Sequence, residues 1–224
     1  MDKFLKVFLC KEEYELPVKL DNLDLHETEI NRFSEIKSMK KAREFLLSRF
    51  ILQDILKTEF DLPLKKFKKK SNIPILEDSS INISMSHSGG YFLYGFSNMK
   101  IGVDIETKLP KSNAIDLARK YFSLKEQLQI ESQPDALEQK KYFQRIWSLK
   151  ESYFKFWGEQ QSIEKVNDLV FDLDGGLNSV SRDSVFYFQK FENLSFSICI
   201  ESVPVSSKIM ILGENVPING LDKF

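Results

Sequence analysis

The sequence is poor in residues that break or cross-link a chain. Glycine occurs 9 times and proline 7 times in 224 residues, a composition that argues against disorder. The two cysteines, Cys10 and Cys199, form neither a CxxC pair nor a zinc-ligand spacing. We therefore expect a reduced, cytoplasmic protein without structural disulfides.

Long apolar runs and an excess of one charge are also absent. No run approaches the roughly 20 apolar residues of a membrane helix, and the N-terminal stretch lacks the apolar region and cleavage site of a signal peptide. Lysine and arginine total 32 against 33 aspartates and glutamates, a net charge of −1. We therefore expect neither a membrane nor a nucleic acid as a partner.

What is present is a large apolar fraction of 42%, with 19 phenylalanines. Hydrophobic periodicity predicts a strand over residues 4–10, helices in at least two pieces over about 22–57, a loop at 65–70 and successive strands within 81–106. Ser123 has the spacing of a helix N-cap. A longer helix over about 136–157, ending near Gly158, precedes strands at 169–173, 185–190, 194–201 and 209–212. This order predicts an α+β fold with two halves, 1–106 and 107–224.

The segment I-G-V-D-I-E at 101–106 contains the first candidate site. In a strand, Gly102, Asp104 and Glu106 share one face, with the two acidic Cα atoms roughly 6–7 Å apart. Two carboxylates so spaced can bind one hard cation such as Mg²⁺, and Gly102 is expected to leave open space beside them. An ordinary half-exposed strand explains the same pattern.

The segment W-S-L-K-E-S-Y-F-K at 147–155 contains the second. On a helix, Trp147, Glu151 and Lys155 lie on one stripe. A surface Glu–Lys pair beside a buried tryptophan would look alike. Because the surrounding residues are strongly aromatic, we expect the stripe to be partly buried and its charges to need partners.

The third candidate is the segment S-H-S-G-G at 86–90, predicted to be a turn. Hydroxyls, an imidazole and backbone N–H groups at a glycine-rich bend can cradle phosphate, although a plain hairpin turn is an alternative. A Ser/His hydrolase fits poorly because the chain has no GxSxG elbow. Arg43 and Arg49, with lysines at 37, 40, 41 and 65–70, are either phosphate clamps or a solvated face.

In this order, SHSG, GVDIE and WSLKESYFK resemble phosphopantetheinyl transferases of the surfactin-synthetase-activating type. The resemblance extends from about residue 29 to residue 201 and includes A-I-D-L-A-R-K-Y-F-S-L-K-E, which ends at residue 126. It implies a pseudo-dimer of two similar α+β halves with coenzyme A in the cleft between them. It also implies a monomer that acts on apo acyl or peptidyl carrier proteins.

The resemblance also implies residue roles. Mg²⁺, with Mn²⁺ as an alternative, would be bound by Asp104, Glu106 and Glu151. Coenzyme A would be bound by a second set of side chains: Arg43, Arg49, Ser86, His87, Lys150 and Lys155. A carrier serine would attack the pantetheine-side phosphorus and 3′,5′-ADP would leave. Glu151, directly or through water, would take the serine proton, and Lys155 would stabilise the leaving oxygen.

Two departures from the family pattern stand out. Where relatives often carry Gly-Lys-Pro, this chain has Asn72-Ile73-Pro74, so a cation is missing, and Lys68–Lys70 are candidates to replace it. The glycine-rich stretch after the long helix is reduced to Gly158.

Two other functions fit part of the pattern. A metal-dependent phosphodiesterase or nuclease also uses paired carboxylates and a lysine, but it would need no carrier protein. A non-catalytic carrier-binding protein on the same scaffold would lack one of the three metal carboxylates, and all three are present.

Overall fold

The computed structural model describes residues 2–12, 23, 25–62, 67–70, 73–76, 80–158, 169–173, 184–190, 194–216 and 222–223. The helices in these ranges are α1 (Glu27–Ser34), α2 (Met39–Phe60), α3 (Ala114–Tyr121), α4 (Leu124–Glu131) and α5 (Ala136–Trp157). The strands are β1 (Phe4–Lys11), β2 (Phe67–Lys70), β3 (Ile73–Leu76), β4 (Asn82–Ser88), β5 (Tyr91–Ser97), β6 (Ile101–Glu106), β7 (Val185–Lys190), β8 (Ser195–Ile200), β9 (Ser206–Ile211), β10 (Glu214–Val216) and β11 (Asp222–Lys223).

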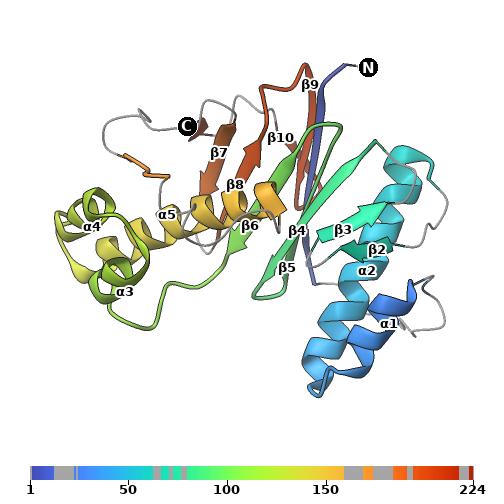
Figure 1. Ribbon diagram of the computed structural model, residues 1–224, viewed down its shortest axis with the longest axis horizontal. Helices are drawn as coiled ribbons and strands as arrows, with labels where there is room; N and C mark the ends of the chain where they lie inside the picture. The colour runs from blue at the N-terminus through green and yellow to red at the C-terminus, as the bar shows by residue number, and fades with distance from the viewer. Residues whose placement is uncertain are drawn as a thin grey trace.

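The strands form two sheets in the middle of the molecule (Figure 1). The larger has the order β10-β9-β1-β5-β4-β3-β2 and the smaller β11-β7-β8-β6. Figure 1 shows α1 and α2 at one end and α3 and α4 at the other, with α5 running along the smaller sheet. The predicted α+β class is confirmed, whereas the pseudo-dimer stays a prediction.

Three apolar clusters show how these parts are layered. Side chains of α2, such as Leu52, pack on the larger sheet. A second cluster joins the two sheets and includes Leu93 of β5 and Val103 of β6. A third packs α3, α4 and α5 on the outer face of the smaller sheet, where Phe186 lies. The smaller sheet is therefore covered on both faces, by the larger sheet and by α5.

Several predicted elements are confirmed closely. The alternation of Ile101, Val103 and Ile105 forms the buried face of β6 that joins the two sheets. Ser123 caps α4 in a complete capping box with Glu126. The long helix α5 ends at Gly158, whose φ of 66° suits glycine.

Other predictions were wrong. Residues 67–70, predicted as loop, form β2, while 65 and 66 lie outside the described residues. Ser86, His87 and Ser88 belong to β4, and only Gly89 and Gly90 make the turn. The space expected beside Gly102 is filled by the backbone of α5, because a Cβ there would lie 1.9 Å from the Ser152 carbonyl oxygen.

Residues 169–173 were predicted as a strand but form no regular element. Their backbone is held instead by helix side chains. The N–H of Phe171 donates to Glu126 at 3.0 Å, and that of Leu173 donates to Gln129 at 2.8 Å. The alternating apolar residues point into the core as in a strand, but α4 supplies the hydrogen-bond partners.

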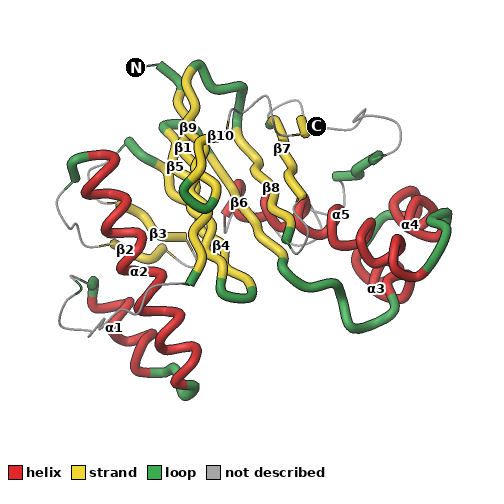
Figure 2. The backbone as a smooth tube through the Cα atoms, turned by 180° about the vertical axis from the view of Figure 1, so that it is seen from behind, coloured by secondary structure: helices red, strands yellow, loops and turns green. Residues whose placement is uncertain are grey.

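Each sheet contains strands from both sides of the predicted boundary at residue 106. β6 pairs with β8 along its whole length, and β9 returns to pair in parallel with β1. Figure 2 shows both pairings from behind. The division into residues 1–106 and 107–224 stays a prediction, and any two fragments cut there would each lose a pairing partner.

We therefore expect that neither fragment, 1–106 or 107–224, folds alone. Each would expose a strand edge and the apolar face that it buries against the other. Thermal melting followed by circular dichroism should show no cooperative transition for either fragment. A cooperative transition in one isolated fragment would contradict this expectation.

Candidate active site

Three elements converge where the two sheets meet. Asp104 lies on β6, Ser86 on β4 and Lys155 near the end of α5. The Lys155 ammonium donates to Asp104 Oδ1 at 2.7 Å and to Ser86 Oγ at 2.9 Å. Ser86 Oγ also donates to Asp104 Oδ1 at 3.0 Å. The candidate residues of β4, β6 and α5 thus form one hydrogen-bonded group.

The stripe predicted on α5 faces this group. Trp147 donates a hydrogen bond to Glu106 and packs on Tyr121 and Phe143. Glu151 lies one turn further along the helix, close enough to Asp104 for their charges to interact. Close approach of α5 to β6 is possible because Gly102 has no side chain in the way.

The acidic side chains lie in a poorly hydrated place. Burial, and then the charge of Asp104, raises the pKa of Glu106 to about 7, and Lys155 opposes the rise. Burial also raises the pKa of Glu151, with Asp104 adding to the effect. Crowded, buried carboxylates of this kind favour either a proton or a cation between them.

The chemistry of these side chains fits a metal ion. Asp104 Oδ2 is buried and has no hydrogen-bond partner among the described residues, and carboxylate oxygens are the ligands that Mg²⁺ prefers. As the side chains stand, no three His, Cys, Asp or Glu within the described part of the chain converge closely enough to hold a metal ion. Asp104, Glu106 and Glu151 would have to close around it.

The raised pKa of Glu106 makes a prediction about stability. A carboxyl whose pKa is higher in the folded state stabilises the fold fully below its ordinary value of 4.5 and loses that contribution as pH rises through about 7. Between about pH 5 and pH 8, the Tm of the metal-free wild type should fall relative to that of Glu106→Gln, which carries no charge. Calorimetric scans that stay parallel across this range would show that Glu106 has an ordinary pKa.

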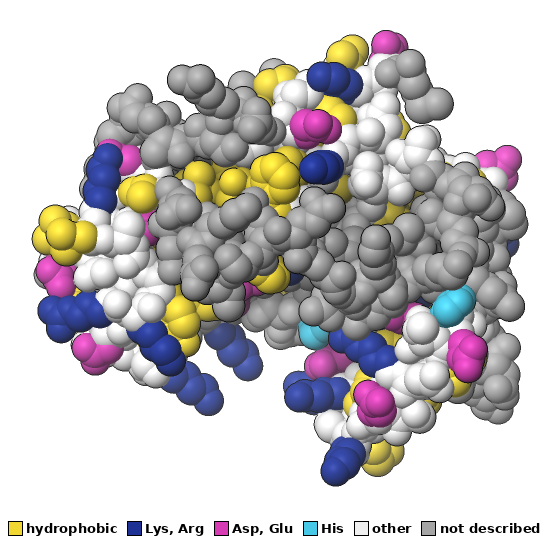
Figure 3. Space-filling view, viewed as in Figure 1, with side chains coloured by type: hydrophobic (Ala, Val, Ile, Leu, Met, Phe, Trp, Pro, Cys, Tyr) yellow, Lys and Arg dark blue, Asp and Glu magenta, His cyan; other side chains and the backbone are white. Residues whose placement is uncertain are grey.

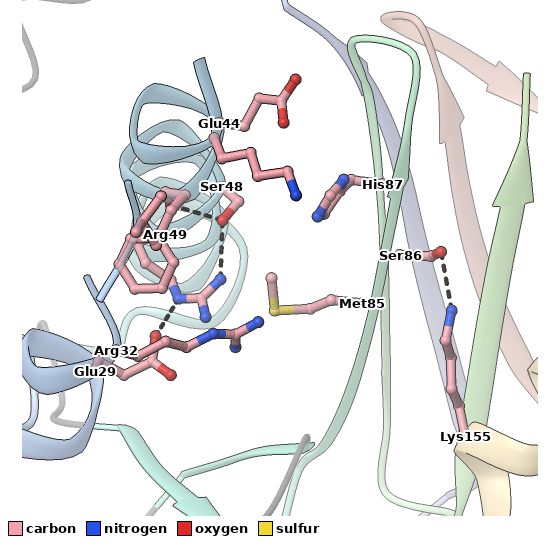
Figure 4. A pocket seen from close by; sticks show the side chains of 12 residues that line it. Glu29, Arg32, Glu44, Ser48, Arg49, Met85, Ser86, His87 and Lys155 are labelled. Atoms are coloured by element: carbon pink, nitrogen blue, oxygen red, sulfur yellow. Dashed lines mark hydrogen bonds and ion pairs between the residues drawn. The ribbon is translucent and has the colours of Figure 1, made fainter. Parts of the chain in front are cut away.

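A cavity of about 490 Å³ adjoins this group, between β4 and the helices α1 and α2, and Ser86 and Lys155 are part of its lining. Figure 4 shows the side chains around it. Its lining combines four cations, two carboxylates and six other residues: Arg32, Lys41, Arg49, Lys155, Glu29, Glu44, Ile36, Phe45, Ser48, Met85, Ser86 and His87. The cations outnumber the carboxylates, so the cavity suits an anionic ligand.

The cations of the cavity differ in how they are held. Arg49 is bound to Glu29 and to Ser48, and its guanidinium lies 4.4 Å from the centre of the Phe45 ring. The guanidinium of Arg32 points into the cavity toward Met85 (Figure 4). Figure 3 shows Lys and Arg side chains on both sides of a notch at the lower edge of the molecule. The net charge of −1 therefore hides a locally basic surface.

His87 also lines this cavity, and its contact with coenzyme A stays a prediction. Burial is the main reason that its pKa is lowered; Glu44 opposes the shift, while Lys155 and Arg49 add to it. A neutral imidazole at this position can donate one hydrogen bond without adding charge.

Two residues predicted to bind coenzyme A are not brought to this group. Lys150 is 4% exposed and points to the opposite side of α5, where it pairs with Glu126 at 3.1 Å and donates to the Leu169 carbonyl. Arg43 does not line the cavity and lies 3.7 Å from Glu12. The side chains of residues 68–70 and 73 lie outside those that the structure describes.

A second, more apolar cavity of about 310 Å³ adjoins the carboxylates on the α3 and α5 side. Its lining includes Glu106, Lys108, Leu117, Tyr121 and Trp147. Glu106 and Trp147 therefore border this cavity, whereas Lys155 borders the basic cavity. The cluster of carboxylates therefore lies between the basic cavity and the apolar cavity.

Sequence reasoning missed Arg32, Glu29, Glu44 and Met85 of the basic cavity. The only signal for Arg32 and Glu29 was their i, i+3 spacing on one short helix. Met85 falls within the strands predicted over 81–106, but the side it faces depends on where α2 packs.

Known proteins that resemble this chain are 4′-phosphopantetheinyl transferases. Residues 100–202, which include β6 and α5, match the 4′-phosphopantetheinyl transferase superfamily. The 4′-phosphopantetheinyl transferase Sfp of Bacillus subtilis is 31% identical over 54% of this chain and 55% of its own length. A Bacillus pumilus transferase, psf-1, is 32% identical over 53% of this chain and 51% of its own length.

A putative 4′-phosphopantetheinyl transferase of Synechocystis is 27% identical over 80% of this chain and 70% of its own length. The matches to the two Bacillus proteins span only about half the length of each. None of the described helices is long and apolar enough to span a membrane. The resemblance predicted from the sequence is thus confirmed: residues 100–202 are similar to the 4′-phosphopantetheinyl transferase superfamily.

Proposed function

We propose that this protein transfers the 4′-phosphopantetheine group of coenzyme A to a serine of an apo acyl or peptidyl carrier protein and releases 3′,5′-ADP. The observation that carries the proposal is the position of Lys155. Its ammonium binds Asp104 and Ser86 at the wall of the basic cavity, beside the crowded carboxylates Glu106 and Glu151. This is the place where a bound pyrophosphate would meet both its cations and a base.

The basic cavity would hold the nucleotide end of coenzyme A. Arg32 and Arg49 offer guanidinium groups, which bind phosphate oxygens in pairs. Ser86 and His87 of β4 form the opposite wall and can donate further hydrogen bonds. Arg32 takes a place that sequence reasoning gave to Arg43.

The carboxylates would hold the magnesium ion, with Mn²⁺ as an alternative. Asp104 would use its unpartnered Oδ2, and Glu106 and Glu151 would add one oxygen each. When bound, such an ion neutralises charge on the pyrophosphate. A cation there also offsets the repulsion that raises the pKa of Glu106.

The transfer itself needs one group that accepts the serine proton and one that donates a hydrogen bond to the leaving group. The serine Oγ would form a bond to the pantetheine-side phosphorus, and the bond from that phosphorus to the oxygen of 3′,5′-ADP would break. Glu151, whose raised pKa makes it a better base than an ordinary carboxylate, would accept the serine proton. Lys155 would hydrogen-bond the leaving oxygen. No covalent enzyme intermediate is required.

The apolar cavity gives the carrier serine a route to the carboxylates. It reaches Glu106 from the side opposite the nucleotide, with Tyr121 and Trp147 in its walls. Donor and acceptor would then approach the group from two directions, as an in-line displacement needs. We expect the protein to act as a monomer in the cytoplasm, without nucleic acid or membrane.

The proposal is tested with the purified protein, coenzyme A, Mg²⁺ and a panel of apo acyl and peptidyl carrier proteins. Intact-mass spectrometry should show that at least one carrier gains one phosphopantetheine group. A carrier with serine replaced by alanine should gain nothing, and neither should any carrier in the presence of EDTA. Unmodified carriers across a broad panel would contradict the proposal.

A further inference from the structure

Strands β4 and β6 lie against each other although they belong to different sheets. Among the described strands, β6 is the last of the smaller sheet and is paired on one edge, by β8. An edge strand leaves N–H groups without a backbone partner, and these need another acceptor when they are buried. Here the acceptors are serine hydroxyls of β4.

The serines alternate along β4, so that they share one face of the strand. Val103 N–H donates to Ser84 Oγ at 2.9 Å, and Thr107 N–H donates to Ser88 Oγ at 3.3 Å. Ser88 Oγ also lies 2.9 Å from Thr107 Oγ1. Between them, Ser86 donates to Asp104. We call Ser84, Ser86 and Ser88 the serine seam.

The opposite face of β4 forms a wall of the basic cavity. Met85 and His87, which alternate with the seam residues, line that cavity (Figure 4). One strand therefore contacts the basic cavity through Met85 and His87 and the carboxylate strand through the serine seam, whose middle member Ser86 also lines the cavity. The position of Asp104 relative to a ligand in the cavity depends on how β4 meets β6.

The Ser88 end of the serine seam packs especially closely against Thr107. Gly89, with a φ of +54°, lies so near Thr107 that a Cβ on it would be 2.3 Å from Thr107 Oγ1. At the other end Ser84 is buried, with 5% of its surface exposed. The two outer serines thus fix β6 on both sides of Asp104.

We propose that Ser84 and Ser88 are positioning residues, which fix the positions of Asp104 and Glu106 relative to the basic cavity. They touch neither cavity, and they act through the strand that they hold. This inference rests on the proposed transferase function, because it assigns the seam a role in that reaction. A misplacement of about 1 Å far from the chemistry can cost about a hundredfold in rate.

The test compares the double variant Ser84→Ala/Ser88→Ala with Ser97→Ala as a matched control. Ser97 is fully buried, donates to the Phe4 carbonyl at 2.6 Å and accepts from Met99 N–H at 3.0 Å. The variant Ser97→Ala therefore loses hydrogen bonds comparable to those lost in the double variant, but away from the serine seam. The measurements are Tm, kcat and the KM for coenzyme A.

For the double variant we expect kcat to fall about tenfold or more, with the KM for coenzyme A changed less than about threefold, because the cavity itself is intact. Ser97→Ala should lower Tm and leave kcat within about twofold of wild type. Ser88→Thr, which keeps the hydroxyl, should restore most of the activity lost in Ser88→Ala. An unchanged kcat in the double variant, or an equal loss of kcat in Ser97→Ala, would overturn the proposal.

Hydrogen exchange separates failure of the seam from failure of the proposed function. The amides of Val103 and Thr107 should exchange faster in the double variant, whether or not the wild type transfers phosphopantetheine. Unchanged exchange at both amides would refute the seam. A wild type without transfer activity would instead refute the transferase function and, with it, the role assigned to the seam.

Discussion

Asp104→Asn is expected to lower kcat/KM for phosphopantetheine transfer by about a thousandfold, which corresponds to roughly 4 kcal/mol of transition-state stabilisation. Asn has the shape of Asp but neither its charge nor its second anionic oxygen. The substitution removes the unpartnered Oδ2 proposed to bind the metal ion and leaves Lys155 without its carboxylate partner. Activity is measured by intact mass of the carrier against time, at several concentrations of coenzyme A.

Glu59→Gln is the matched control for this variant. Glu59 is also a carboxylate paired with lysines, Lys6 and Lys208, but it lies near the C-terminal end of α2, whereas the basic cavity is lined by the first half of that helix. It should lose a little stability and keep kcat/KM within about twofold. If Asp104→Asn folded normally and retained more than about a tenth of wild-type activity, Asp104 would not be an essential ligand.

Gly102→Ala is expected to be the most disruptive methyl group that can be added near the site. The new Cβ would lie 1.9 Å from the Ser152 carbonyl oxygen and 2.4 Å from the Phe156 nitrogen. Both atoms belong to the backbone of α5, which can yield only as a unit. Overpacking costs typically about 1–3 kcal/mol, and a clash between two backbones should reach or exceed the top of that range.

Because α5 carries Glu151 and Lys155, its displacement should also lower kcat by about a hundredfold. Gly95→Ala tests whether any added methyl at this interface would do the same. Its Cβ would meet Val103 Cγ1 at 2.7 Å and Ile101 Cδ1 at 2.8 Å, which are side-chain atoms rather than the backbone of a helix. Calorimetry and kinetics should therefore show a smaller effect for Gly95→Ala. A Gly102→Ala protein as stable and active as wild type would contradict the packing of α5 on β6.

Local patterns predicted the elements that build the site. Strict alternation identified β6 and its inward face, and the i, i+4, i+8 spacing identified the stripe of α5 that carries Trp147, Glu151 and Lys155. These patterns work because a strand and a helix each have one period, so that residue spacing alone decides which side chains share a face.

Helix phase would also have corrected the role predicted for Lys150. It is adjacent to Glu151 in sequence but about 100° away around the helix, on the side of the buried Ile146 and Tyr153. Its side chain therefore meets Glu126 in the core. Membership of a sequence motif does not imply the same face of a helix.

Contacts between distant segments could not be predicted in this way. The parallel pairing of β1 with β9 joins the two ends of the chain, and no local pattern specifies it. Nor does the sequence tell whether a missing side chain leaves space or admits a neighbour; at Gly102 it admits the backbone of α5. The segment 169–173 shows the same limit, because its partners are side chains of α4.

The central claim is transfer to a carrier protein, and release of 3′,5′-ADP tests it most directly. The nucleotide is quantified by chromatography after incubation with coenzyme A and Mg²⁺, with and without an apo carrier. We predict release only when the carrier is present, in a one-to-one ratio with the phosphopantetheine that the carrier gains. Release at the same rate without any carrier would contradict the account and would identify a metal-dependent phosphodiesterase instead.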